Sequence, residues 1–168
     1  YCHVFEPVEG GHKRRYKATT DSKHALPVAP FHDLVSAFRQ DVTVGRYATY
    51  GELADYCRRS ANPVGRILLA LYGADSPANA RASDAVCTGL QLTNFWQDVA
   101  LDWRRSRVYV PAEDMARFGV TESQIAAQRA DDRWCALAAF ETARARALLR
   151  EGRPLARALP WRLGLELA

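Results

Sequence analysis

Five polar residues recur every three or four positions in the middle of the chain, and their types suit the binding of a charged ligand. They are Gln91, Asn94, Asp98, Asp102 and Arg105. On a helix this spacing aligns them into one stripe, with the two carboxylates about 6 Å apart along the axis. Bulky apolar residues occupy the other faces of the same segment, which favours burial. Because buried carboxylates must be paired or bound to a metal, the stripe predicts an ion-binding site that faces a cavity.

Magnesium suits this acidic stripe. Mg²⁺ prefers carboxylate oxygens, keeps several waters and commonly bridges one or two protein carboxylates to substrate phosphates. Asp98 and Asp102 fit that role, and Asn94 adds a neutral oxygen. The arginines that follow suit contacts with phosphate oxygens, because a guanidinium matches them in a bidentate way; they are Arg104, Arg105 and Arg107. Metal and arginine together would stabilise a departing diphosphate.

Aromatic residues fit the second half of such a reaction. Loss of diphosphate from an allylic carbon leaves a carbocation, and an aromatic ring attracts a cation to its face. The candidates for this role, and for excluding water from the cavity, are Tyr56, Phe95, Trp96 and Tyr109. Periodicity alone leaves open which of them face the cavity.

The same residues also have purely structural explanations, which compete with the functional ones. An isolated pair of aspartates four residues apart on a helix more often faces solvent than a metal. Tyr56, Phe95 and Trp96 are by default core residues, and the arginines by default complement the dipole at a helix end. Cys57 and Cys87 fit as small buried hydrophobes. The histidines fall in the N-terminal segment or at the edge of the first expected helix and receive no catalytic role; they are His3, His12, His24 and His32.

Helices must position these residues, because the sequence contains no alternating strand pattern. Ser76 and Pro77 form an N-cap and a first-turn proline, which open the helix that carries the stripe. Capping-box patterns at 49–52 and 121–124 start two others. The expected helices span about residues 31–43, 49–60, 63–73, 77–104, 122–152 and 154–167. The fold class is therefore all-α.

The connections between these helices carry signals of their own. Asn62-Pro63 predicts a bend between two helices, residues 106–110 predict an extended connector, and Pro111 starts a short helical turn. Gly89 lies inside the expected 77–104 helix, which indicates close packing or room for a ligand. A core stripe is expected on the third helix, at Val64, Ile67, Leu68 and Leu71.

The composition of the 168 residues is that of one globular domain, with 48% hydrophobic and 25% charged residues. The formal charge is +4, but arginines alternate with acidic residues and no basic and aromatic surface for nucleic acid stands out, so we expect no nucleic-acid partner. Scattered cysteines and the lack of an uncharged apolar stretch long enough to span a bilayer indicate a cytoplasmic protein with reduced thiols. Peripheral association with the inner membrane face stays open. Residues 1–24 are polar and basic, and we expect them to form a poorly ordered arm.

Three motifs, in order, resemble the squalene/phytoene synthase family. The first runs from Tyr56-Cys57 to Asn62-Pro63-Val64-Gly65, the second is Leu90-Gln91-Leu92-Thr93-Asn94-Phe95-Trp96-Gln97-Asp98 continuing to Asp102, and the third is Arg107-Val108-Tyr109-Val110-Pro111. The form Ala-Asn-Pro-Val-Gly together with Asn-Phe-Trp-Gln-Asp is most similar to the bacterial hydroxysqualene synthase branch, in hopanoid biosynthesis. The resemblance covers residues 25–168.

This resemblance implies an all-α terpenoid-synthase fold whose central cavity binds a prenyl diphosphate through magnesium. The metal and diphosphate ligands it implies are Asn94, Asp98 and Asp102, with Gln91 among the substrate-binding residues. Tyr56 matches a cavity tyrosine implicated in catalysis, and Gly65 matches a position where a helix break shapes the cavity. Arg107 and Tyr109 match the segment that closes over the diphosphate. The implied reaction converts presqualene diphosphate into hydroxysqualene without a nicotinamide cofactor.

The sequence departs from the family in one respect, because the family carries two aspartate-rich motifs and this chain contains the second alone. We therefore expect a partial terpenoid-synthase bundle, incomplete at both ends, with half of the metal site and no turnover by itself. The alternative hypothesis is a non-catalytic helical module that binds a partner protein or a membrane surface through its exposed helix faces.

Overall fold

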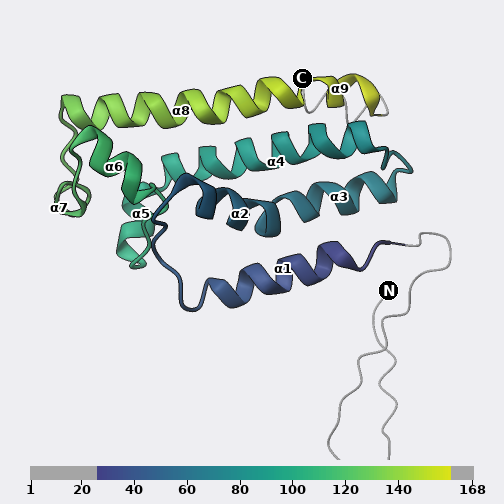
Figure 1. Ribbon diagram of the computed structural model, residues 1–168, viewed down its shortest axis with the longest axis horizontal. Coiled ribbons are helices and arrows are strands. Elements are labelled where there is room, and N and C mark those ends of the chain that lie inside the picture. The colour runs from purple at the N-terminus through teal and green to yellow at the C-terminus, as the bar shows by residue number, and fades with distance from the viewer. Residues whose placement is uncertain (1–25, 160–168) are drawn as a thin grey trace, which may run out of the picture.

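The described part of the chain, residues 26–159 of a computed structural model, is built from helices connected by short loops (Figure 1). Within these residues strand-type pairing is limited to one isolated parallel bridge between Arg46 and Val108, which confirms the all-α class. The helices are α1 Ala29–Gln40, α2 Tyr50–Ser60, α3 Asn62–Leu71, α4 Pro77–Gln97, α5 Val99–Arg104, α6 Ala112–Phe118, α7 Glu122–Ala126, α8 Asp132–Gly152 and α9 Pro154–Ala158.

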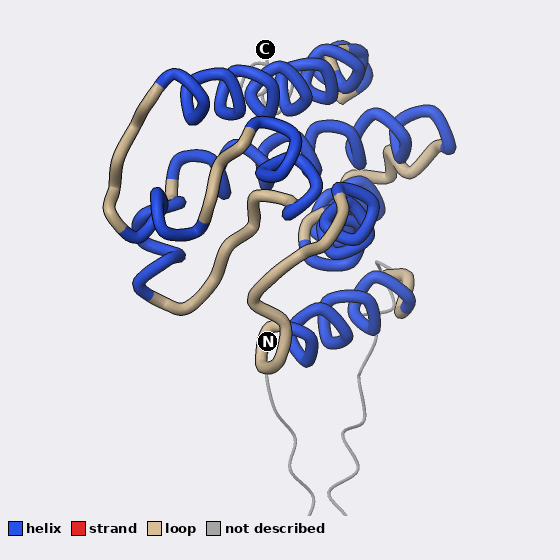
Figure 2. Tube along the Cα trace, turned by 60° about the vertical axis from the view of Figure 1, so that its left-hand side comes forward, coloured by secondary structure: helices blue, strands red, loops and turns tan. Residues whose placement is uncertain are grey.

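The long helices stack in layers around α4. α8 covers one side of α4, α3 packs on another side, and α1 lies beyond α2 and α3 (Figures 1 and 2). The short helices α5, α6 and α7 gather at one end of the bundle, opposite the loop that joins α3 to α4 (Figure 1). The acidic stripe on α4 and α5 therefore ends among short elements, where a bound group can be approached from several segments.

Local capping chemistry starts the helices where the sequence predicts. The Thr49 hydroxyl accepts a hydrogen bond from the Glu52 backbone N–H at 3.2 Å, and the Ser76 hydroxyl accepts one at 3.2 Å from the N–H of Asn79. Thr121 and Gln124 form the expected capping box at the start of α7. Each cap satisfies a backbone donor that the first helical turn leaves unpaired, so these boundaries are confirmed.

The expected helix 77–104 is wrong as a single element. α4 ends at Gln97, Asp98 takes φ −98° and ψ 13°, and α5 begins at Val99. The bend allows Val99 and Trp103 to pack against the buried cluster that contains Val108, Met115 and Leu137. Tertiary packing thus overrides a segment whose local sequence is compatible with one continuous helix.

The other boundaries differ in smaller ways. The segment from 122 to 152 forms two helices, because Asp131 caps a new one by accepting from the Trp134 N–H at 3.0 Å. α1 runs from Ala29 to Gln40 and not over 31–43. The expected last helix, 154–167, is seen as α9 up to Ala158, and the rest of it lies outside the described residues. The expected arm 1–24 lies outside them as well.

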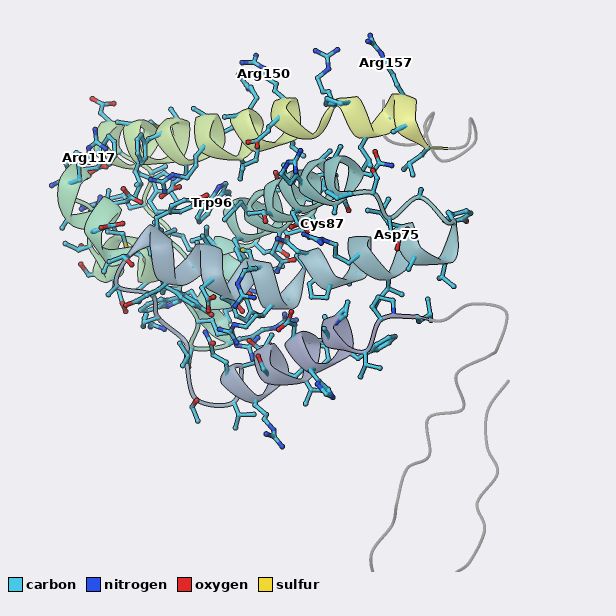
Figure 3. The ribbon with its side chains drawn as sticks, turned by 45° about the vertical axis from the view of Figure 1, so that its right-hand side comes forward. Asp75, Cys87, Trp96, Arg117, Arg150 and Arg157 are labelled. Carbon is cyan, nitrogen blue, oxygen red and sulfur yellow. The ribbon has the colours of Figure 1, made fainter. Side chains whose placement is uncertain are left out.

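The core contains several buried clusters, and Trp96 connects two of them. One cluster contains residues of α1, α2 and α4 together with Tyr109, and another joins the 108–110 segment to α6, α7 and α8. Trp96 packs against both clusters and lies between α4 and α8 (Figure 3). Gly89 lies against Leu149 of α8, where an added Cβ would approach the side chain to 2.9 Å. Of the two explanations for this glycine, close helix packing is the one confirmed.

The core stripe expected on α3 is wrong for three of its four members. Val64, Leu68 and Leu71 are exposed, and Leu69 is buried instead. Gly65 faces α4, where an added Cβ would meet Ser83 Oγ and approach Cys87 Sγ to 2.7 Å. Because α3 approaches α4 through its glycine face, its larger apolar side chains are left on the outside.

None of the helices in residues 26–159 is long and apolar enough to cross a membrane.

Candidate functional site

The polar stripe continues through the bend at Asp98. The Asp98 N–H donates to the Asn94 carbonyl at 2.9 Å and the Asp102 N–H donates to the Asp98 carbonyl at 2.8 Å, so the helical four-residue spacing continues through it. Along the stripe Gln91 is half-buried, Asn94 and Asp98 are exposed, and Asp102 is 8% exposed. The stripe thus runs from the open surface of α4 into the protein at α5.

The two carboxylates of the stripe act on each other. Burial raises the pKa of Asp102, the neighbouring Asp98 charge raises it further, and Arg105 and Arg107 oppose both effects. Among the described residues no other carboxylate, histidine or cysteine joins them in a group of three. Neither carboxylate is used in a side-chain hydrogen bond within the described residues. Two mutually repelling carboxylates with free oxygens suit a divalent cation that takes its remaining ligands from water and phosphate, so these residues fit magnesium.

Arg107 connects the stripe to the aromatic residues. Its backbone N–H donates to the Asp102 carbonyl at 2.9 Å, which closes the turn after α5. Its Nη1 donates to the Tyr109 hydroxyl at 3.4 Å, and its Nη2 donates to the Asp41 carbonyl at 3.2 Å. The Val108 N–H donates to the Gly45 carbonyl at 2.8 Å, so this extended segment is held against the residues that precede α2.

Tyr56 and Tyr109 belong to one aromatic cluster with Tyr47 and Phe95. The Phe95 and Tyr109 rings stack with centroids 3.8 Å apart and planes within 7°. The Tyr56 centroid lies 5.5 Å from that of Tyr47 and 6.1 Å from that of Tyr109. Since Phe95 and Tyr109 cover each other's faces, these two rings stabilise the wall of the site and the stacked faces are closed to a carbocation. Trp96 lies in the core between α4 and α8.

Asp41 and Tyr47 lie at the candidate site, although the sequence did not indicate them. The charge of the Asp41 carboxyl group acts on Tyr56, and it also acts on Tyr47, Tyr109 and Arg107. Burial is the main cause that raises the pKa of Tyr56, and Asp41 adds to it. Asp41 lies directly after α1 and no local motif marks it, because its role depends on a contact with a segment 66 residues away in the chain.

The remaining predicted residues take other positions. Arg104 and Arg105 are exposed at the end of α5, whereas Arg107 is half-buried. Gly65 lies inside α3, and the break between α2 and α3 occurs four residues earlier at Ala61, so the expected helix break at Gly65 is wrong. Cys57 is buried and Cys87 is half-buried, in agreement with a packing role.

Comparison with known proteins identifies relatives over most of the chain. A family model described as squalene/phytoene synthase matches residues 11–168. A hydroxysqualene synthase of Rhodopseudomonas palustris is 38% identical over 162 residues, which cover 95% of this chain and 54% of that protein. A phytoene synthase of Arthrospira platensis is 35% identical over 157 residues, covering 86% of this chain and 49% of the relative.

A solved structure agrees with these sequence relatives. The crystal structure of squalene synthase HpnC from Alicyclobacillus acidocaldarius has a TM-score of 0.83 and 43% identity, covering 87% of this chain and 56% of that one. The chain therefore spans about half the length of the relatives it matches.

Proposed function

The chain belongs to the squalene/phytoene synthase family, and from that premise we propose that it forms part of an enzyme acting on prenyl diphosphates. The specific reaction proposed is magnesium-dependent conversion of presqualene diphosphate into hydroxysqualene. The similarity to a hydroxysqualene synthase supports this choice over phytoene formation, as do the motifs Ala61-Asn62-Pro63-Val64-Gly65 and Asn94-Phe95-Trp96-Gln97-Asp98.

One observation carries the proposal: Arg107 connects the acidic stripe to the buried tyrosine cluster. Its backbone N–H donates to the Asp102 carbonyl at 2.9 Å and its charge acts on the Asp102 carboxyl group, while its Nη1 donates to the Tyr109 hydroxyl at 3.4 Å. Carboxylates attract a divalent cation, a guanidinium matches phosphate oxygens, and buried aromatic groups exclude water. A diphosphate on a long isoprenoid chain needs all three properties in one place.

The roles of the residues follow from their charges. Asp98 and Asp102, with the Asn94 side-chain oxygen, would hold magnesium, which when bound neutralises part of the diphosphate charge. Arg107 donates hydrogen bonds to the same diphosphate, and Gln91, farther along the stripe, would orient it. Tyr109 is the hydrogen-bond partner that fixes the guanidinium of Arg107.

In the proposed reaction the carbon–oxygen bond of presqualene diphosphate breaks and the electron pair leaves with the diphosphate. Arg107 stabilises the charge that builds on the leaving group. The cyclopropylcarbinyl cation rearranges, a water molecule bonds to the rearranged cation, and loss of a proton gives hydroxysqualene. No electrons are added, so no nicotinamide reductant enters. Tyr56 takes part as a neutral hydroxyl, because burial and Asp41 hold its pKa above the usual range and disfavour the phenolate.

The location proposed for this chemistry is the cytoplasm, with peripheral contact to the inner membrane face. Long isoprenoid products partition into bilayers, and a peripheral enzyme can release them there. No nucleic-acid partner is proposed.

Calorimetric titration of the 168-residue chain with inorganic diphosphate, with and without magnesium, tests the site. We expect binding that requires magnesium and that falls by at least about tenfold in D98N and D102N. The matched control is D75N, because Asp75 is exposed in the loop at the opposite end of the bundle (Figure 3). Binding that is equal in D98N and wild type would overturn the site assignment.

Product analysis tests the reaction separately. Presqualene diphosphate and magnesium are incubated in separate samples with the chain, with an unmodified relative of full length, and with that relative carrying the substitution that matches D98A. We expect hydroxysqualene from the unmodified relative and loss of turnover in its variant. Phytoene or squalene as the main product would refute the specific reaction while leaving the diphosphate site intact.

A non-catalytic helical module remains the second candidate function, and the exposed apolar side chains of α1 and α3 favour it. Phe38 is 60% exposed, Val35 is 51% exposed and Val64 is 48% exposed. Such surfaces mark contacts with other protein or with membrane. The same titration discriminates, because an interaction module binds no diphosphate in the presence of magnesium.

A further inference from the structure

Two buried carboxyl groups and one guanidinium join α6 to α8. Asp114 of α6 is 4% exposed and Glu141 of α8 is 2% exposed. Arg144 Nη1 donates to Asp114 Oδ2 at 2.9 Å and to Glu141 Oε2 at 2.9 Å. The Arg144 guanidinium also lies 3.8 Å from the centroid of the Tyr50 ring, which belongs to α2. The cluster therefore ties three helices together.

The charges of this cluster balance if one carboxyl group is neutral. Two carboxylates facing one guanidinium would leave a net negative charge in a buried place, which is costly. Glu141 Oε1 is buried and has no hydrogen-bond partner among the described residues, a poor environment for an ionised oxygen. Burial is the main cause that raises the pKa of Glu141 to about 7; Arg144 opposes this shift and Asp114 reinforces it. Glu141 is thus the group that holds the proton.

The cluster anchors the segment that carries Arg107 and Tyr109. α6 follows this segment directly, and the Ala112 N–H donates to the Tyr47 carbonyl at 3.0 Å. A Glu113 side-chain oxygen accepts from the Tyr50 N–H at 2.7 Å. Once α6 is fixed on α8, the segment before it is held between α6 and the residues that lead into α2.

We propose that Asp114, Glu141 and Arg144 form a proton-dependent lock between α6 and α8. In this lock Glu141 is a neutral carboxylic acid next to the Asp114 carboxylate, and Arg144, which donates to both groups, neutralises the charge of Asp114. Ionisation of Glu141 weakens the α6–α8 contact and loosens the segment 107–111.

Other groups that face the cluster stay in one charge state through the relevant pH range. From α2 these are Tyr50 and, behind it, Cys57; burial raises the pKa of both groups, that of Cys57 to about 12. α4 presents Trp96, which does not titrate and which packs against the clusters that contain Leu137 and Ala145, on either side of Glu141. The proton on Glu141 is therefore the variable that sets the state of the lock.

The sign of the pH effect follows from linkage. Between the ordinary glutamate pKa of 4.5 and about 7, folded Glu141 keeps a proton that the unfolded chain has lost. Folding stability therefore falls as pH rises through this window and levels off above it. For one proton the unfolding constant changes by up to about tenfold per pH unit.

Denaturant unfolding of the 168-residue chain between about pH 5 and about pH 8 measures this linkage. In E141Q the amide imitates the neutral acid, so we expect E141Q to match wild type near pH 5 and to exceed it in stability near pH 8. The matched control is E151Q, because Glu151 is exposed on the same helix, and it should follow wild type. Amide hydrogen exchange of residues 107–118, corrected for the intrinsic rate, should accelerate above neutral pH in wild type and not in E141Q.

Two results would overturn the lock. In the first, the difference in unfolding free energy between wild type and E141Q stays constant from about pH 5 to about pH 8. This means that Glu141 titrates outside this window. The other is an E141Q protein that is less stable than wild type at every pH, which means that Glu141 forms an ordinary ion pair with Arg144. D114N gives an independent check, because removal of the neighbouring carboxylate should lower the pKa of Glu141 and move the wild-type pH dependence to lower pH. An unmoved profile in D114N contradicts the proposal.

Discussion

At the scale of single residues, the hydroxyl of Tyr56 and the guanidinium of Arg107 matter most to the proposed chemistry. Asp41 acts on both groups: its backbone carbonyl accepts a hydrogen bond from Arg107 at 3.2 Å, and its charge raises the pKa of Tyr56. The phenol keeps its proton because burial and a neighbouring negative charge both disfavour the phenolate. In the proposed mechanism Tyr56 would therefore act as a neutral hydrogen-bonding group.

Y56F removes the hydroxyl of Tyr56 and keeps its aromatic ring. The ring stays packed against Tyr47 and Tyr109, so we expect the free energy of unfolding to change by about 1 kcal/mol or less. Product formation, measured in a relative of full length, should fall by at least about tenfold. Y72F is the matched control, because Tyr72 is 52% exposed and lies outside the site. Full activity in Y56F would remove its hydroxyl from the mechanism.

D98N tests the repulsion within the acidic stripe. Without metal, loss of the Asp98 charge relieves Asp102, and we expect the chain to gain about 0.2–0.5 kcal/mol in the free energy of unfolding at neutral pH. Magnesium with diphosphate should raise the melting temperature of wild type by more than that of D98N, since ligand binding stabilises the folded state and D98N binds more weakly. A metal-free D98N that melts below wild type would show that the two carboxylates do not repel each other.

At the scale of elements, the close packing of α3 on α4 fixes the position of α2, the helix that carries Tyr56. Gly65 and Cys87 meet at this contact, and Asn62 at the start of α3 accepts a hydrogen bond from the Thr88 hydroxyl at 2.9 Å. Tyr56 lies six residues before Asn62, on α2 and across the bend, so the α3–α4 contact also sets the direction of α2. A glycine at this contact permits an approach that a side chain would prevent.

G65A tests this close contact against helix propensity. Alanine favours a helix by about 1 kcal/mol over glycine, but here its Cβ would collide with Ser83 and Cys87, and overpacking costs about 1–3 kcal/mol. We expect net destabilisation in thermal or denaturant unfolding. G51A is the matched control, because Gly51 is exposed on α2 and a Cβ there meets only Thr49 Oγ1, at 3.6 Å; it should gain stability. Equal gains in both variants would mean that α3 and α4 are farther apart.

At the scale of the whole molecule, the described residues leave apolar surface on α1 and α3. Phe31, Val35 and Phe38 lie on α1, and Val64 and Leu68 lie on α3, all exposed by more than two fifths. The buried core lies on the other side of these helices, around α4. Exposed apolar residues should therefore contribute much less to the free energy of unfolding than buried core residues do.

Replacing Val35 and Phe38 together by glutamine measures this difference. Because both side chains are exposed, we expect the free energy of unfolding to change by less than about 1 kcal/mol. Binding of a hydrophobic dye and self-association, followed by light scattering, should both decrease. L53A provides the contrast, because Leu53 is fully buried and its truncation should cost about 2–5 kcal/mol. A large stability loss in the glutamine variant would show that the α1 face is covered in solution.

Local physics explains why much of this could be predicted from the sequence alone. The all-α class, the caps at Thr49, Ser76 and Thr121 and the alignment of Asn94, Asp98 and Asp102 depend on residues within four positions of one another. Hydrogen bonds and helical spacing act over that range, so a linear pattern contains them. The order of the three motifs also sufficed to indicate the family.

Tertiary structure decided the rest. The bend at Asp98, the exposure of Val64 and Leu68, and the association of Asp41 with Tyr56 and Arg107 arise from contacts between segments tens of residues apart. Which face of an apolar helix is buried depends on how closely a neighbour can approach, and at α3 a glycine with no side chain determines that distance. Spacing along the chain could not indicate it, because steric fit between helices is a property of their arrangement in space.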